Sequence, residues 1–162
     1  MCSSDLENLL DRNYYENVIS NVTPLQNQGR LYKKFLLLEI DVMNIKLILK
    51  MKQENLQEKT IKDLIFTYGT IKKQTIEQLL KSDDVVKELE KTALKDAITE
   101  HKESLSELEL QFDVFLLREA AKLIKQSPLS VDTIIGYMFM KDKEVKNLSR
   151  IVKAKQLELS DE

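Results

Sequence analysis

The chain contains only three glycines and two prolines among its 162 residues. Tight β-turns depend on these two residue types, so a chain with so few of them cannot make the many short turns of an all-β fold. Apolar residues form 43% of the sequence, and at this length a compact fold buries roughly two-thirds of the unfolded chain's surface. We therefore expect an all-α protein with a hydrophobic core.

The charges nearly cancel, since 25 Lys and Arg stand against 27 Asp and Glu, giving a net charge of −2. A nucleic-acid-binding domain usually carries a clear basic excess, so this balance argues against a nucleic-acid partner. Gly29, Gly69 and Gly136 lie too far apart for a phosphate-binding loop. With Cys2 alone, the sequence offers neither an intrachain disulfide nor a cysteine-based zinc site. We expect no cofactor.

The start of the sequence lacks the basic residues and apolar stretch of a secretory signal. The longest apolar runs, 35–38 and 134–140, are far shorter than the roughly 18 residues of a membrane span. We therefore expect an intracellular protein that is soluble or peripheral to a membrane.

Helical periodicity and capping residues predict a succession of helices. Ser4 with Glu7, Ser104 with Glu107, and Ser106 with Glu109 have the spacing of capping boxes. We expect Gly69 to adopt the left-handed αL conformation, with positive φ, at a helix end. The predicted helices span residues 4–23, 30–53, 58–66, 70–81, 85–98, 104–127 and 131–156. The second is apolar almost all round, so we expect it at the centre of the fold.

Two parts of the chain are related as an internal repeat. Residues 40–53 and 143–156, compared at an offset of 103, share six identities in fourteen positions, where unrelated segments would share about one. At an offset of 102, Ser4, Leu6, Glu7 and Asp11 match Ser106, Leu108, Glu109 and Asp113. We expect a duplicated helical-bundle unit, with a first repeat at 1–103 and a second, incomplete at its end, at 104–162.

An acid-x-x-Asn pair recurs in the repeat, as Asp41 with Asn44 and as Glu144 with Asn147. Each pair lies on one helix face, and polar groups in an apolar helix need partners. We expect them to hydrogen-bond a neighbouring helix or turn. A metal-binding alternative would need Glu-x-x-His motifs on facing helices, but the chain has only one histidine, His101.

The sequence contains no catalytic constellation. His101-Lys102-Glu103 matches the first half of a zinc-deaminase pattern, but the Pro-Cys-x-x-Cys that completes it is missing. No nucleophile motif accompanies the histidine. We expect no enzymatic activity and no metal ion.

The last predicted helix carries a basic stripe. Lysine or arginine recurs at spacings of three, four and three, on the side opposite Val145, Leu148 and Val152; the basic residues are Lys143, Lys146, Arg150 and Lys153. Such a stripe is usually a solvated face. The alternative is an acidic protein surface as its partner, because Asp142 and Glu144 dilute the charge that an anionic membrane would require.

As a set, several motifs resemble the C subunit of archaeal and bacterial V/A-type rotary ATPases, the equivalent of the d subunit of the eukaryotic V-ATPase. The resemblance spans nearly the whole chain and rests on motifs in a fixed order: Leu6-Glu7, Leu10-Asp11-Arg12, Tyr14-Tyr15, Glu39-Ile40-Asp41, Asn44, Lys50, Tyr68-Gly69-Thr70, Ile135-Gly136-Tyr137, Lys141, Glu144-Val145 and Asn147-Leu148. Family members carry three helical units in a funnel, and this chain resembles the second and third.

The resemblance implies a non-catalytic rotor subunit without a small-molecule substrate of its own. Such a subunit sits on the cytoplasmic end of the membrane rotor ring and holds the central shaft, passing torque during proton or sodium ion transport. It is peripheral to the membrane through the ring. A generic all-α scaffold or regulatory domain is the alternative. A long coiled coil is disfavoured because Pro24, Gly69 and Pro128 divide the chain into bundle-length helices.

Overall fold

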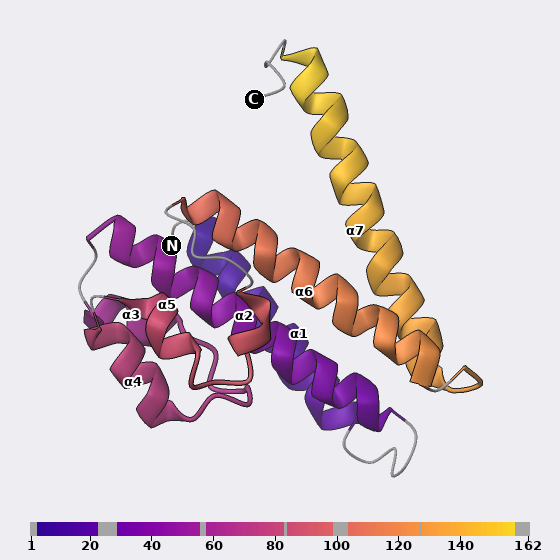
Figure 1. Ribbon diagram of the computed structural model, residues 1–162, viewed down its shortest axis with the longest axis horizontal. Coiled ribbons are helices and arrows are strands. Elements are labelled where there is room, and N and C mark those ends of the chain that lie inside the picture. Colours follow the sequence, from indigo (N-terminus) through magenta and orange to yellow (C-terminus); the bar gives the residue numbers. More distant parts are fainter. Residues whose placement is uncertain are drawn as a thin grey trace.

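The computed structural model describes residues 3–22, 29–55, 58–82, 84–98, 104–126 and 128–157, and this part of the chain contains helices and no strand (Figure 1). In chain order the elements are α1 (Ser3–Val22), α2 (Arg30–Gln53), α3 (Glu58–Leu64), α4 (Lys73–Lys81), α5 (Val85–Leu89), the 3₁₀ helix η1 (Lys95–Ala97), α6 (Leu105–Gln126) and α7 (Val131–Gln156). The expectation of an all-α protein is confirmed.

Helix α2 lies at the centre of the fold, in contact with α1, α3, α6 and α7. Its buried side chains are spread around the helix axis, as the all-round apolar pattern predicted. On one side, Ile45 and Ile48 join the main core with α4, α5 and α6. On another side, Leu36 and Ile40 pack with Tyr15 of α1. The main core includes residues on both sides of the proposed boundary at 103/104, and that division stays a prediction.

The long helices begin and end where local signals place them. Helices α2 and α7 have the predicted bounds, and α1 and α6 differ from them by one residue at each end. The side chains of Ser4 and Glu7, which were expected to form a capping box, lie outside the described part of the structure. The capping box expected for Ser106 with Glu109 is wrong, because α6 begins at Leu105 and Ser106 lies inside it.

The first turns of α2 and α7 are joined by the buried side chain of Asp132. Its Oδ1 accepts a hydrogen bond from the backbone N–H of Tyr32, with an N–O distance of 2.9 Å. The hydroxyl of Ser130, the N-cap of α7, accepts from the Asp132 N–H at 3.1 Å. The first amides of a helix have no partner within the helix. Asp132 therefore satisfies an amide of α2 while fixing the start of α7 beside it.

The helix predicted over 85–98 is shorter, since α5 ends at Leu89. The Thr92 hydroxyl donates to the Leu89 carbonyl at 2.7 Å and accepts from the Leu94 N–H at 3.1 Å. Local hydrogen bonds from threonine hydroxyls compete with helical ones. The chain therefore turns after α5 into the short helix η1, although Leu89 and Leu94 both remain buried.

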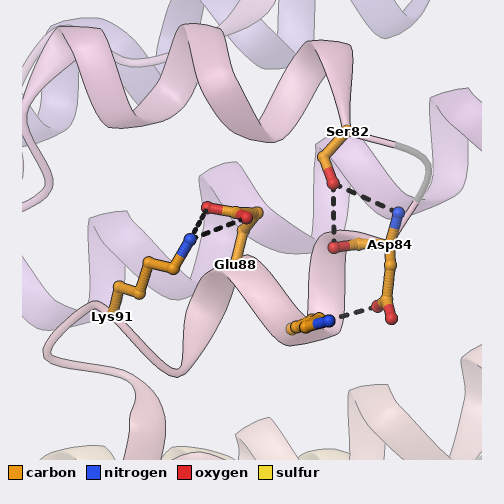
Figure 2. A network of polar contacts seen from close by, with 5 residues as sticks. Ser82, Asp84, Glu88 and Lys91 are labelled. Atoms are coloured by element: carbon orange, nitrogen blue, oxygen red, sulfur yellow. Dashed lines mark hydrogen bonds and ion pairs between the residues drawn. The ribbon is translucent and has the colours of Figure 1, made fainter.

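The connection between α4 and α5 carries the N-cap of α5 (Figure 2). Ser82 Oγ accepts from the Asp84 N–H at 3.2 Å and donates to the Asp84 carbonyl at 3.0 Å. Asp84 Oδ1 then accepts from the Lys87 N–H at 3.0 Å, which caps α5. Lys91 forms an ion pair with Glu88 at 2.9 Å one turn further on.

Helices α6 and α7 cross closely near Gly136. A Cβ atom at this position would lie only 3.0 Å from the carbonyl oxygen of Ala120 on α6. From this crossing α7 diverges from α6, and its C-terminal part stands away from the other helices (Figure 1). Every residue from Glu144 to Lys153 is exposed. The second half of α7 thus presents a free surface in the described part of the chain.

Replacing Asp132 tests the junction of α2 and α7. We expect Asp132→Ala to lower the free energy of unfolding by about 1–3 kcal/mol, because the acceptor for the partly buried Tyr32 amide at the start of α2 is lost. Chemical denaturation of the variant measures this loss. Asp142→Ala, at an exposed position of the same helix, is the control, and equal losses for the two variants would contradict the role given to Asp132.

Candidate partner-binding surface

The buried carboxylate of Asp41 binds the connection between α3 and α4. It accepts hydrogen bonds from the backbone N–H groups of Thr70, at 2.9 Å, and Ile71, at 3.2 Å, and also from the Thr70 hydroxyl. Asp41 is only 1% exposed, and this burial raises its pKa above the ordinary value. The three hydrogen bonds favour the ionised form and partly offset that increase.

Asn44, one turn along α2 and 2% exposed, binds the same connection through a paired hydrogen bond. Its Nδ2 donates to the Phe66 carbonyl at 3.0 Å, and its Oδ1 accepts from the Phe66 N–H at 2.9 Å. These backbone groups are therefore not available to a helix. The predicted helices 58–66 and 70–81 are accordingly shorter, with α3 ending at Leu64 and α4 beginning at Lys73.

Gly69 has positive φ, as expected, but its predicted αL conformation at a helix end is wrong. Its φ of 150° is far from the αL value of about 57°, and it lies within the connection between α3 and α4. The cause is the close approach of Asp41, because a Cβ atom on Gly69 would clash with Oδ1 of that carboxylate. The glycine therefore allows the backbone to reach its acceptor.

The second acid-x-x-Asn pair has different surroundings. Glu144 and Asn147 are both exposed on α7. Glu144 forms an ion pair with Lys141 of its own helix at 2.6 Å, and within the described residues Asn147 makes no hydrogen bond to another element. The expected bonds to a neighbouring helix or turn are therefore absent from this part of the structure.

The four residues of the predicted basic stripe fall into two groups. Lys143 is half-buried and reaches Asp113 of α6 at 3.4 Å, and Lys146 forms an ion pair with Asp142 at 2.7 Å. Arg150 and Lys153 lie further along the exposed half of α7. They make no ion pair with any described residue. The stripe is thus partly neutralised near the body of the protein and unneutralised toward the end of the helix.

Asp113 joins three helices, a role that its sequence context did not predict. Its Oδ1 lies 3.0 Å from Nζ of Lys46 on α2, and it also meets Lys143 of α7. Burial raises the pKa of Asp113, but the hydrogen bond and charge of Lys46, together with Lys143, outweigh burial and bring the pKa below its ordinary value. The one sequence signal was its match to Asp11 in the repeat.

The described residues offer no metal-binding group of three or more histidine, cysteine or acidic side chains. His101 and Cys2, both considered above as candidate site residues, lie outside them. Among the helices that the structure describes, none combines the length and the apolar character needed to cross a membrane.

Comparison with known proteins identifies the family. The family model described as ATP synthase (C/AC39) subunit matches residues 2–162. The chain therefore belongs to the ATP synthase C/AC39 subunit family, which confirms the resemblance found in the sequence. Members of this family are non-catalytic subunits of the ATP synthase complex.

Several curated relatives are named as the C subunit of an A-type ATP synthase. The chain is 32% identical to that of Methanococcoides burtonii over 98% of its own length and 47% of the relative's. It is 31% identical to that of Methanobrevibacter smithii, over 93% of its own length and 42% of the relative's. It is 30% identical to that of Pyrococcus abyssi, over 86% of its own length and 40% of the relative's. The chain thus spans about half the length of the curated relatives it matches. No solved structure gives a significant match.

The two acid-x-x-Asn pairs provide a matched test of burial. We expect Asn44→Ala to lower the free energy of unfolding by about 2–4 kcal/mol, because two hydrogen bonds are lost and both partners on Phe66 remain buried. Asn147→Ala should change it by less than about 0.5 kcal/mol, as is usual for a surface position. Urea denaturation of both variants makes the comparison. A similar decrease in the free energy of unfolding for both variants would refute the difference in burial and bonding between Asn44 and Asn147.

The ion pairs of Asp113 predict a pH dependence. Because its folded-state pKa is lowered, its ionised form stabilises the protein above its unfolded pKa of about 3.9, and this stabilisation is lost as pH falls through the folded pKa. We expect Asp113→Asn to lower the free energy of unfolding by about 1 kcal/mol at neutral pH, since the pairs are partly exposed. The difference from wild type should shrink below about pH 4. Denaturation curves measure the free energy of unfolding of both proteins. If the difference between them did not change with pH, the stabilising role of the ionised Asp113 would be contradicted.

Proposed function

We propose that this chain acts in a V/A-type rotary ATPase or ATP synthase as a non-catalytic rotor subunit, linking the membrane rotor ring to the central shaft. The family match over residues 2–162 is the observation that carries the proposal. The proposed subunit is peripheral to the membrane, on its cytoplasmic face, through contact with the ring. It passes torque between the flow of protons or sodium ions and ATP chemistry in other subunits.

The structure supports a mechanical role through its packing. Close-packed interiors have low compressibility and transmit strain. Helix α2 is surrounded by other helices, and Asp132 and Asp113 add polar links between α2 and the α6–α7 pair. Force applied to one helix is therefore shared with the others. A generic scaffold or regulatory domain would also gain from such stiffness. The two functions are therefore distinguished by which proteins the chain binds.

The exposed half of α7 is the proposed contact surface for an acidic partner. Arg150 and Lys153 carry unneutralised charge there, whereas Lys143 is occupied by Asp113. Exposed ion pairs contribute under about 1 kcal/mol each. Apolar contact elsewhere must therefore supply most of the affinity, because the exposed Val145, Leu148 and Val152 lie on the opposite side of the helix from the basic residues.

Co-purification with the rotor-ring and central-shaft subunits of the same organism tests this function. We expect the chain to associate with both, and the association to weaken with added salt, because exposed charges are screened over about 8 Å at physiological ionic strength. Replacing Lys146, Arg150 and Lys153 by glutamate should weaken it further, whereas the same change at the exposed Lys59, Lys87 and Lys95 should not.

The two halves of this experiment have separate consequences. No association with either subunit would refute the rotor function. Undiminished association after charge reversal on α7 would refute only the role of its basic residues.

A further inference from the structure

The connection between α3 and α4 lines a cleft on the surface of the protein. Its volume is about 410 Å³, which is in the range of sites that bind small ligands. Most of the apolar side chains that line it are buried and form its floor, and charged side chains of both helices form its rim. The floor residues are Ile65, Phe66, Ile71, Ile76 and Leu80, and the rim residues are Lys62, Lys73 and Glu77.

Hydrogen bonds to α2 hold the connection in place. The side-chain amide of Asn44 pairs with the backbone of Phe66. The carboxylate of Asp41 accepts from the N–H groups of Thr70 and Ile71. Most ligand sites are largely formed before the ligand binds. The floor of this cleft meets that condition, because contacts within the protein fix it.

Helix α4 brings a cation and two buried apolar residues to the cleft on a single face. Lys73, Ile76 and Leu80 are separated by three and four positions, which places them on one side of the helix. Ile76 is only 8% exposed and Leu80 3%, whereas Lys73 is exposed. Lys62, in the last turn of α3, supplies a second cation. Neither lysine forms an ion pair with a described residue, so both charges are available to an anion.

A ligand that matches this cleft combines an apolar group with a negative charge. A carboxylate with an aliphatic chain offers both, because the chain covers the floor and the carboxylate reaches the lysines. A polypeptide segment fits less well, since each peptide unit carries an N–H and a carbonyl that an aliphatic floor leaves without partners. Glu77 is the acidic residue of the rim. It repels a second carboxylate, which favours a ligand with a single charge.

We propose that the cleft formed by α3, α4 and their connection binds an aliphatic monocarboxylic acid of medium length. The chain of the acid lies along the apolar floor, and its carboxylate forms ion pairs with Lys62 and Lys73 at the rim. This inference goes beyond the rotor function and does not depend on it. A chain that failed to bind the ring or shaft subunits would still bind this ligand.

Titration of the methyl-labelled chain with octanoate, followed by NMR, tests the inference. We expect saturable shifts of the methyl resonances of Ile65, Ile71, Ile76 and Leu80, with intermolecular nuclear Overhauser effects from the octanoate chain to the same groups. Between hexanoate and octanoate the affinity should rise by about fourfold for each added CH₂, as expected when the chain is buried. Octanol, which has no charge, and octanedioate, which has two, should each bind more weakly than octanoate.

Two double variants test the role of the lysines. Lys62→Gln combined with Lys73→Gln should weaken octanoate binding by about fivefold or more, because two partly exposed ion pairs are lost. Lys87→Gln combined with Lys95→Gln removes the same charge from exposed positions outside the cleft, and this control should bind octanoate as wild type does.

Several results would overturn the proposal. One is the absence of octanoate binding at millimolar concentration, and another is a set of shifts confined to methyl groups outside the cleft. Equal binding of octanol and octanoate, or undiminished binding by the variant at Lys62 and Lys73, would also contradict it. Tighter binding of the peptide Glu-Leu-Leu-Glu at the same methyl groups would show that the cleft takes a polypeptide instead.

Discussion

Helix α2 has buried side chains all around its axis, and two of them are a carboxylate and an amide. Much of the fold depends on how these two groups are satisfied. Asp41 and Asn44 take their partners from the backbone of the connection between α3 and α4. An unmatched polar group in this position would cost more than the hydrogen bond contributes. The connection is therefore held against α2, and Leu79 and Leu80 of α4 are positioned to complete the core.

The two halves of the chain use the same residue spacing in different surroundings. In the first half, the acid-x-x-Asn pair of α2 is covered and fully bonded. In the second half, Glu144 and Asn147 lie on a helix segment that no described element covers. The halves share the main hydrophobic core, and long-range polar contacts, notably Tyr32 with Asp132 and Lys46 with Asp113, add to it. These contacts connect α2 to α6 and α7 and make the halves one packed body.

Local signals in the sequence predicted the long helices well. The periodicity of α2 and α7 and the prolines after α1 and α6 are properties of short segments, and they fixed these bounds to within one residue. The residues between α3 and α4 could not be predicted in this way, because their hydrogen bonds are made to α2. The conformation of Gly69 depends on a carboxylate 28 positions earlier in the chain, and Asp132 meets an amide 100 positions away. Helical periodicity, which is a property of short segments, does not predict such long-range contacts.

The close crossing of α6 and α7 makes the last helix a lever arm. From Gly136 to Gln156 the helix continues for 20 residues, or about 30 Å at 1.5 Å per residue. With an arm of that length, a tilt of about 10° at the crossing moves the far end by about 5 Å. Small changes in the contact between Gly136 and Ala120 are thus amplified into displacements of Arg150 and Lys153. The absence of a side chain at Gly136 sets how closely α7 approaches α6 at the crossing.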